Sequence, residues 1–225
     1  MSRNINFNEV LELGSRYVGA NIRRIVCQAS RPFLINFAAT YRCNGRCLMC
    51  NIWKTRAYNE LSLEELQELV ANSTFKKLRV VQITGGEAFL RPDIRQIVSL
   101  FYESLREPQI SIATNALAPK RIFDVAREIC EEVPRWQIWV SLDGLGQTHD
   151  RIRGIPGAFG MVMETCRLLR TLKNRYNSLR VGINFTLSNR NYRELESVFL
   201  LAREMDFGFS FGMVTTSGLY YGDQG

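Results

Sequence analysis

Three of the six cysteines in this sequence lie close enough together to hold a metal. Cys43, Cys47 and Cys50 fall within eight residues, in the segment Cys-Asn-Gly-Arg-Cys-Leu-Met-Cys. Packing does not explain such a group in a loop with polar and basic neighbours, whereas thiolates this close together are normally held by metal. We therefore expect these three residues to form a metal site.

The number of available ligands favours one kind of metal site. A structural zinc site takes four ligands, often as two pairs, and this sequence has no second cysteine pair. Its single histidine, His149, lies about a hundred residues away. A cubane cluster has four irons, so three cysteines leave one iron open to bind a small molecule. The spacing favours a three-thiolate iron–sulfur cluster, with zinc or purely structural cysteines as the alternatives.

The other cysteines are predicted to be packing residues. Cys130 and Cys166 lie among apolar neighbours in helical patterns, and free cysteine is one of the most buried residue types. Cys27 ends an amphipathic segment and is also predicted to be structural.

The composition indicates a soluble, globular chain. Of its 225 residues, 46% are hydrophobic and 23% are charged, which excludes a disordered, collagen-like or coiled-coil protein. The apolar runs are far shorter than the roughly 20 residues that cross a membrane. The first residues lack the apolar core of a secretory signal, so we expect a cytoplasmic protein with reduced thiols.

Helical and strand patterns alternate along the chain. The segments predicted to be helices are 7–27, 62–72, 94–105, 119–131, 157–174 and 191–205. Those predicted to be strands are 33–39, 78–83, 109–113, 136–142, 180–187 and 207–214. This alternation predicts an α/β fold with a parallel sheet in one domain, 32–216. A basic amphipathic helix, 1–31, precedes that domain, and 217–225 form a tail at which a further C-terminal region would begin.

Polar residues gather at the carboxyl ends of the predicted strands. In strand order they are the cysteine loop, Thr84-Gly-Gly-Glu87, Thr114-Asn115, Ser141-Leu-Asp-Gly144, Asn184 and Met213. The carboxyl ends of the strands of an α/β barrel share one face, on which active sites are built. We therefore expect these motifs to form one site.

Together these motifs resemble those of the radical S-adenosylmethionine (radical SAM) enzymes. The resemblance covers roughly residues 33–215 and rests on Cys43-x3-Cys47-x2-Cys50, Gly85-Gly86-Glu87, Ala113-Thr-Asn115 and Ser141-Leu-Asp-Gly144. The tract 141–154 is similar to the branch that contains molybdenum-cofactor and peptide-maturation enzymes. The resemblance implies a partial (β/α)6 barrel, and a [4Fe-4S] cluster and S-adenosylmethionine as cofactors.

The resemblance also implies roles for the site residues that surround the cluster. Cys43, Cys47 and Cys50 would hold it, and S-adenosylmethionine would chelate the open iron. Gly85 and Gly86 would let the backbone approach the methionine part closely, because they have no Cβ. Glu87 would accept a hydrogen bond from the ammonium group.

Other residues would bind the rest of the cosubstrate. Arg153 would pair with its carboxylate, and Ser141 would contact the ribose or the carboxylate. Thr114, Asn115 and Asn184 would contact the ribose or the substrate, and Met213 with Val214 would offer backbone groups to the adenine. Met49 stands where the family often has an aromatic residue, and Ala88 stands where it commonly has proline.

The implied activity is that of a radical enzyme. S-adenosylmethionine would be cleaved reductively, and the resulting 5′-deoxyadenosyl radical would abstract hydrogen from an unidentified substrate. The alternative is a non-catalytic iron–sulfur or zinc protein for electron relay or partner binding, which leaves Gly85-Gly86-Glu87 and Ser141-Leu-Asp-Gly144 unexplained. For His149, a structural hydrogen bond and a catalytic role both stay open.

The net charge of +7 is concentrated in the first quarter of the chain. Residues 13–59 contain eight basic and no acidic side chains, whereas 60–225 contain 20 of each. Such a field attracts an anionic partner, for which we expect an acidic electron donor such as flavodoxin or ferredoxin. Peripheral contact with an anionic membrane and a plain solvated face are the alternatives, and sparse aromatic residues argue against nucleic acid.

The cysteine assignment can be tested by counting iron. Replacing any one of Cys43, Cys47 or Cys50 by alanine should abolish cluster assembly, because each would hold a different iron. Cys130→Ala should bind iron like the wild type, since its expected role is packing. Unchanged iron content in reconstituted Cys47→Ala would show that the cluster assignment is wrong.

Overall fold

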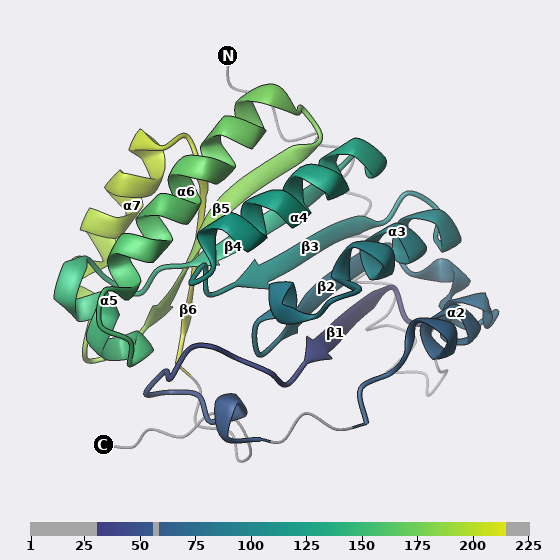
Figure 1. The fold of residues 1–225 in the computed structure, drawn as a ribbon, viewed down its shortest axis with the longest axis horizontal. Coiled ribbons are helices and arrows are strands. Elements are labelled where there is room, and N and C mark those ends of the chain that lie inside the picture. Colours follow the sequence, from purple (N-terminus) through teal and green to yellow (C-terminus); the bar gives the residue numbers. More distant parts are fainter. Residues whose placement is uncertain (1–30, 56–58, 215–225) are drawn as a thin grey trace, which may run out of the picture.

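One parallel sheet organises the computed structural model, which describes residues 31–55 and 59–214. Its strands are β1 (Leu34–Thr40), β2 (Val80–Gly85), β3 (Gln109–Thr114), β4 (Trp136–Ser141), β5 (Leu179–Leu187) and β6 (Gly208–Met213). They pair in sequence order, each parallel to the next, as Figure 1 shows. β1 and β6 are the two edges, so the sheet does not close. The predicted α/β fold and partial barrel are confirmed.

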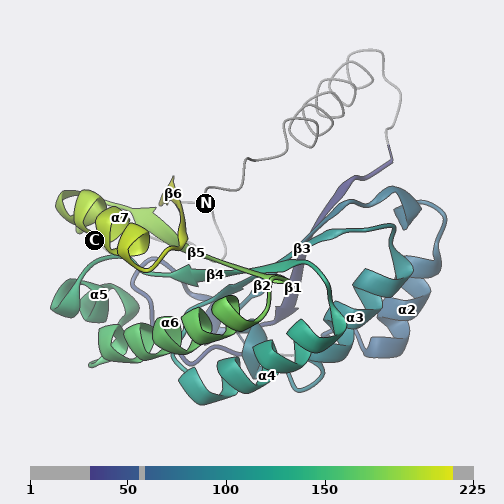
Figure 2. The ribbon, with the colours of Figure 1, turned by 90° about the horizontal axis from the view of Figure 1, so that it is seen from above.

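Helices cover one face of this sheet. They are α2 (Leu63–Ala71), α3 (Ile94–Ser104), α4 (Pro119–Glu132), α6 (Ala158–Arg175) and α7 (Leu195–Glu204). The short helix α5 (Gly146–Arg153) packs against α6 beyond the end of β4 (Figure 1). Figure 2 shows α2, α3, α4 and α6 side by side along the same side of the sheet. We call this side the convex face and the opposite side the concave face.

The core lies between the sheet and these helices. Alternate strand residues such as Ile83, Ile112 and Ile138 are fully buried, and Phe101 and Ile122 pack there from α3 and α4. Intervening strand residues point to the concave face, because successive side chains in a strand alternate between faces. Cys130 and Cys166 are also buried in the core, which confirms their predicted packing role.

Local sequence signals explain where two helices begin. Ser62 caps α2: its hydroxyl accepts from the Glu65 N–H at 3.2 Å, and the Glu65 carboxylate accepts from the Ser62 N–H at 2.8 Å. Pro119 stands at the first residue of α4, where its missing N–H costs no helical hydrogen bond.

The structure corrects the prediction in one segment. The stretch before α6, predicted to be a long loop, contains α5. The buried residues of α5 are His149, Ile152 and Arg153, so two of the three are polar and no apolar periodicity marks the helix. The helix predicted over 191–205 begins only at Leu195, after a short 3-10 turn.

Several predictions concern residues outside the described ranges. The amphipathic helix predicted at 7–27, Cys27 and the tail predicted at 217–225 all lie there. Among the helices that the structure describes, none has the length and apolar character needed to cross a bilayer.

Candidate active site

The predicted motifs meet around one cavity of about 400 Å³ at the carboxyl ends of the strands. The predicted site residues that line it are Cys43, Cys47, Cys50, Gly85, Gly86, Thr114, Asn115, Ser141, Arg153, Asn184 and Met213. Met49 and Val214 line it as well. Glu87 is the one predicted site residue that is not part of the lining.

The glycine pair at the end of β2 packs directly against the backbone that leads into the cysteine loop. The Gly86 N–H donates to the Thr40 carbonyl at 2.7 Å, and the Glu87 N–H donates to the Arg42 carbonyl at 2.8 Å. A Cβ on Gly85 would lie 2.4 Å from the Thr40 oxygen, and one on Gly86 would lie 2.2 Å from the Arg42 oxygen. The chain's own backbone therefore requires both glycines, whereas close approach of methionine stays a prediction.

The end of α5 holds the cysteine loop from the other side. The N–H groups of Arg46 and Leu48 donate to the carbonyls of Arg153 and Ile152, each at 2.9 Å. Gly154 ends the helix in the left-handed conformation at φ 66°, and a Cβ there would lie 2.3 Å from the Arg46 oxygen. Residues before Cys43 thus bond to the glycine pair, and residues around Cys47 bond to α5.

A buried ion pair places a guanidinium beside the cysteines. The Arg153 guanidinium forms an ion pair with the Asp143 carboxylate, with 2.7 Å between Nη2 and Oδ2, and donates to the sulfur of Cys47 at 3.6 Å. Asp143 is fully buried and also accepts from the Thr186 N–H at 2.8 Å. Burial raises the pKa of Asp143, and the Arg153 charge acts against that rise. Among the described residues of the cavity lining, Arg153 alone carries a charged side chain.

Asn115 links the β3 end to the first cysteine. Its amide donates to the Cys43 sulfur at 3.6 Å and to the Asn44 side-chain oxygen at 2.8 Å. Its side-chain oxygen accepts from the Leu117 N–H at 3.0 Å. The side chain thus bonds within the protein, although one of its surfaces lines the cavity.

Glu87 is fully buried behind the cavity wall. Its carboxylate accepts from the Thr114 hydroxyl at 2.9 Å, the Asn115 N–H at 2.7 Å and the Phe89 N–H at 3.1 Å. Burial raises its pKa to about 6, and these three hydrogen bonds oppose the rise. Glu87 therefore ties the Gly-Gly turn to the β3 end, and its contact with an ammonium group stays a prediction.

Two residues that the sequence analysis did not identify as site residues form hydrogen bonds with the tract 143–148 after β4. Asn191 donates to the carbonyls of Asp143 at 2.9 Å and Thr186 at 2.8 Å. Glu194 accepts from the Leu145 N–H and the Thr148 hydroxyl, both at 2.6 Å. No local signal reveals their contacts with the tract after β4, because Asp143, Leu145 and Thr148 lie nearly fifty residues earlier in the chain.

His149 has a structural place in the same tract. It is fully buried, and its Nδ1 accepts from the Asp143 N–H at 3.0 Å, so the ring proton lies on Nε2. Burial, followed by the charge of Arg153, lowers the pKa of His149 to about 3. The side chain is therefore neutral at physiological pH and does not line the cavity.

The donor set suits an iron–sulfur cluster. Three thiols line the cavity, the lining described here contains no carboxylate or imidazole, and N–H groups of Gly45 and Asn115 point at the Cys43 sulfur. Among the described residues, no three His, Cys, Asp or Glu side chains converge on a single ion position. A cubane separates its cysteines, because each binds a different iron. Burial raises the pKa of Cys43 and Cys50, so ligation would release their protons.

Comparison with known proteins identifies the family. A family model described as the radical SAM superfamily matches residues 38–202, which is most of the chain. The chain belongs to the radical SAM superfamily. This confirms the predicted family, whose enzymes use S-adenosylmethionine together with a [4Fe-4S] cluster.

The radical SAM chain is similar to longer proteins. It is 31% identical to Fe-coproporphyrin III synthase of Methanosarcina barkeri over 168 residues, 73% of this chain and 39% of that one. It is 28% identical to AdoMet-dependent heme synthase of the same organism, over 80% of this chain and 50% of that one. Streptococcus suis SuiB, solved with S-adenosylmethionine, has a similar fold with TM-score 0.70 and 16% identity, over 97% of this chain and 49% of that one. The chain thus spans half or less of each.

Replacing Gly86 by alanine tests whether backbone contact positions the cysteine loop. The added Cβ would meet the Arg42 carbonyl, so we expect a loss of about 1–3 kcal/mol in the free energy of unfolding and reduced iron binding. Gly160→Ala is the matched control, because nothing lies within 4 Å of a Cβ there, on α6. That control should raise stability by about 0.5–1 kcal/mol. Wild-type iron content in Gly86→Ala would contradict this account.

His149 makes stability depend on pH in a predictable direction. The unfolded chain takes up a proton near pH 6.5 and the native protein does not, so stability falls as the pH drops below about 6.5. Relative to His149→Gln, the wild type should lose stability between about pH 6.5 and pH 3, by about 1.4 kcal/mol per pH unit in the middle of that range. Other titrating groups are common to both proteins and cancel in this difference. Denaturant unfolding at several pH values measures it, and a constant difference would refute the buried neutral imidazole.

Proposed function

We propose that this chain is the catalytic core of a radical SAM enzyme, with residues 32–216 as that core. Cys43, Cys47 and Cys50 would hold a [4Fe-4S] cluster, and the adjoining cavity would hold S-adenosylmethionine. The observation that carries the proposal is the meeting of three thiols, the Gly-Gly turn and the β4 and β5 ends around one cavity. Its volume of about 400 Å³ lies within the range of small-molecule sites.

The bound cofactors supply reductive cleavage of S-adenosylmethionine and abstraction of hydrogen from a substrate. This chain's residues bind and orient them. Arg153 offers a guanidinium for the carboxylate, and its pairing with Asp143 fixes the direction of that group. Ser141 and Asn184 are register partners on β4 and β5, so they offer a pair of polar groups to the ribose.

The structure supports some of the other proposed contacts with S-adenosylmethionine better than others. Met49 lines the cavity, and its thioether suits contact with the adenine. Met213 and Val214 line it as well, and their backbone groups would face the adenine. Thr114 and Asn115 already bond within the protein, which favours a positioning role over ligand contact. The contact of Glu87 with the ammonium group has less support, since three donors already use its oxygens. A relay or zinc protein would need no cavity beside the thiols.

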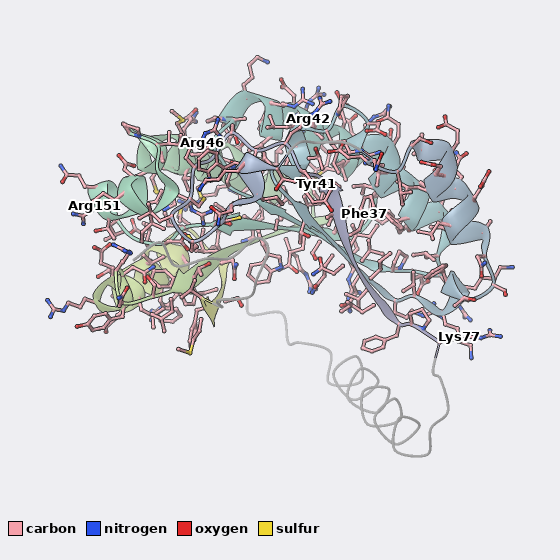
Figure 3. The ribbon with its side chains drawn as sticks, turned by 90° about the horizontal axis from the view of Figure 1, so that it is seen from below. Phe37, Tyr41, Arg42, Arg46, Lys77 and Arg151 are labelled. Carbon is pink, nitrogen blue, oxygen red and sulfur yellow. The ribbon has the colours of Figure 1, made fainter. Side chains whose placement is uncertain are left out.

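An acidic electron donor remains our proposed partner. Arg42, Arg46 and Lys54 are exposed on or beside the cysteine loop, and Figure 3 shows Arg42 and Arg46 along one edge of the molecule. Arg46 and Lys54 flank the Trp53 ring at 5.0 and 5.1 Å from its centre. Positive charge this close to the proposed cluster would steer an acidic protein toward it. Anionic membrane contact is the competing proposal for the same charges.

Replacing Arg42 and Lys54 by glutamine tests whether these charges dock an acidic electron donor. Reduction by flavodoxin should slow by about tenfold at low salt, while dithionite reduction stays unchanged. Arg170→Gln on α6 is the matched control for loss of an exposed charge. Equally fast, salt-insensitive reduction by flavodoxin would remove the docking proposal.

The activity itself is tested by product formation. The anaerobically reconstituted protein with dithionite should convert S-adenosylmethionine to 5′-deoxyadenosine and methionine. Ser141→Ala should weaken S-adenosylmethionine binding by roughly threefold to tenfold, the effect of one lost hydrogen bond. Ser210→Ala is its control, because Ser210 lies outside the cavity lining. A full cluster that yields no 5′-deoxyadenosine would refute the proposed function.

A further inference from the structure

The concave face continues from the cavity toward the amino ends of the strands. In the register of the sheet, Ala38 pairs with Thr84, and Ala113, Trp139, Gly182 and Gly208 are successive partners. Thr84 and Ala113 directly follow the paired residues Ile83 and Ile112, so these six residues form one row across the strands. Thr84 and Ala113 also line the cavity, so this row forms its border. Trp139 is the single large side chain in the row.

The Trp139 indole lies across the neighbouring strands. A Cβ on Gly182 would lie 2.3 Å from Cζ3 and 2.6 Å from Cε3 of this ring, and one on Gly208 would lie 3.9 Å from Cη2. The ring therefore covers Gly182 on β5 and reaches toward β6. Trp139 is only half-buried, so part of the indole faces the concave side. The glycines make this placement possible, because any side chain at Gly182 would displace the ring.

The strand residues of the row next to the indole are polar, and none of them carries a negative charge. The next row toward the amino ends contains Asn36, Gln82, Ser111, Gln137 and Arg180. It lies about 6–7 Å from the Trp139 row, the rise of two strand residues. None of the six strands contains an aspartate or glutamate. Arg180 is exposed at one end of this surface, and Arg153 lies in the cavity at the other.

We propose that the Trp139 row and the Arg180 row together form the substrate-binding surface, for a flat, conjugated molecule that carries carboxylate groups. This inference rests on the proposed function, since it places the substrate beside the S-adenosylmethionine cavity. The conjugated system stacks on the indole, and the small residues on either side of Trp139 leave a flat floor for it. Its carboxylates reach Arg180 and the amides of the adjacent row. Ser141, two residues after Trp139, connects this surface to the cavity.

Coproporphyrin III without metal is a suitable probe, because it is planar, conjugated, fluorescent and carries four carboxylates. Its fluorescence anisotropy reports binding to the reconstituted protein. A linear peptide with four glutamates carries the same charge without the flat ring system. The compared variants are Trp139→Ala, Trp139→Phe, Gly182→Ala and Arg180→Gln, with Arg170→Gln on the helix-covered side as the charge control.

The proposal expects the porphyrin to bind the wild type more tightly than the peptide. Trp139→Ala should weaken porphyrin binding by roughly tenfold or more, and Trp139→Phe by less, because it keeps a smaller ring. Gly182→Ala should also weaken it by lifting the indole, Arg180→Gln should reduce its salt dependence, and Arg170→Gln should change nothing. Porphyrin binding of wild-type strength in Trp139→Ala, no porphyrin binding at all, or equal binding of the peptide would overturn the proposal.

Cleavage of S-adenosylmethionine in the absence of substrate separates this inference from the proposed function. It should stay at the wild-type rate in Trp139→Phe and Arg180→Gln, since neither residue lines the cavity. Normal cleavage together with unchanged porphyrin binding in the Trp139 variants would overturn the substrate surface and leave the radical SAM activity standing.

Discussion

The site depends on a backbone-to-backbone contact that only glycine permits. The backbone before Cys43 packs against Gly85 and Gly86, and the backbone just before Cys47 packs against Gly154. At each glycine a carbonyl oxygen, from Thr40, Arg42 and Arg46 in turn, lies within 2.4 Å of where a Cβ would stand. Four N–H groups bond across these contacts, two from the turn after β2 and two from the loop. The loop is therefore fixed in position by main-chain groups, which leaves its three thiols free for a metal group.

Buried charge connects this loop to the rest of the barrel. Arg153 contacts both Cys47 and Asp143, and the Asp143 backbone is held in turn by His149 and Asn191. Removing one member of a buried ion pair typically costs about 3–5 kcal/mol, because the other charge is left without a partner. Such an arrangement holds a cationic group at the cavity with little freedom to reorient. The proposed role of Arg153 toward a carboxylate follows from that fixed direction.

Much of this was predictable because the signals are local. Alternating helical and strand patterns predicted the parallel sheet, and the cysteine spacing with the Gly-Gly-Glu and Ser-Leu-Asp-Gly tracts predicted which residues meet at the cavity. α5 was missed because it buries His149 and Arg153, which carry no apolar pattern. Asn191 and Glu194 were missed because they brace residues about fifty positions away. The burial of Glu87 depends on β3 lying beside β2, which the motif alone does not reveal.

Hydrogen exchange in the metal-free protein tests the central claim most directly. The N–H groups of Arg46, Leu48, Gly86 and Glu87 donate to carbonyls across the two glycine contacts. If the backbone positions the cysteine loop before any cluster binds, these four amides should exchange as slowly as those of the central strands. Exchange at the rate of an unstructured peptide, with protection that develops only after reconstitution with iron and sulfide, would contradict the account.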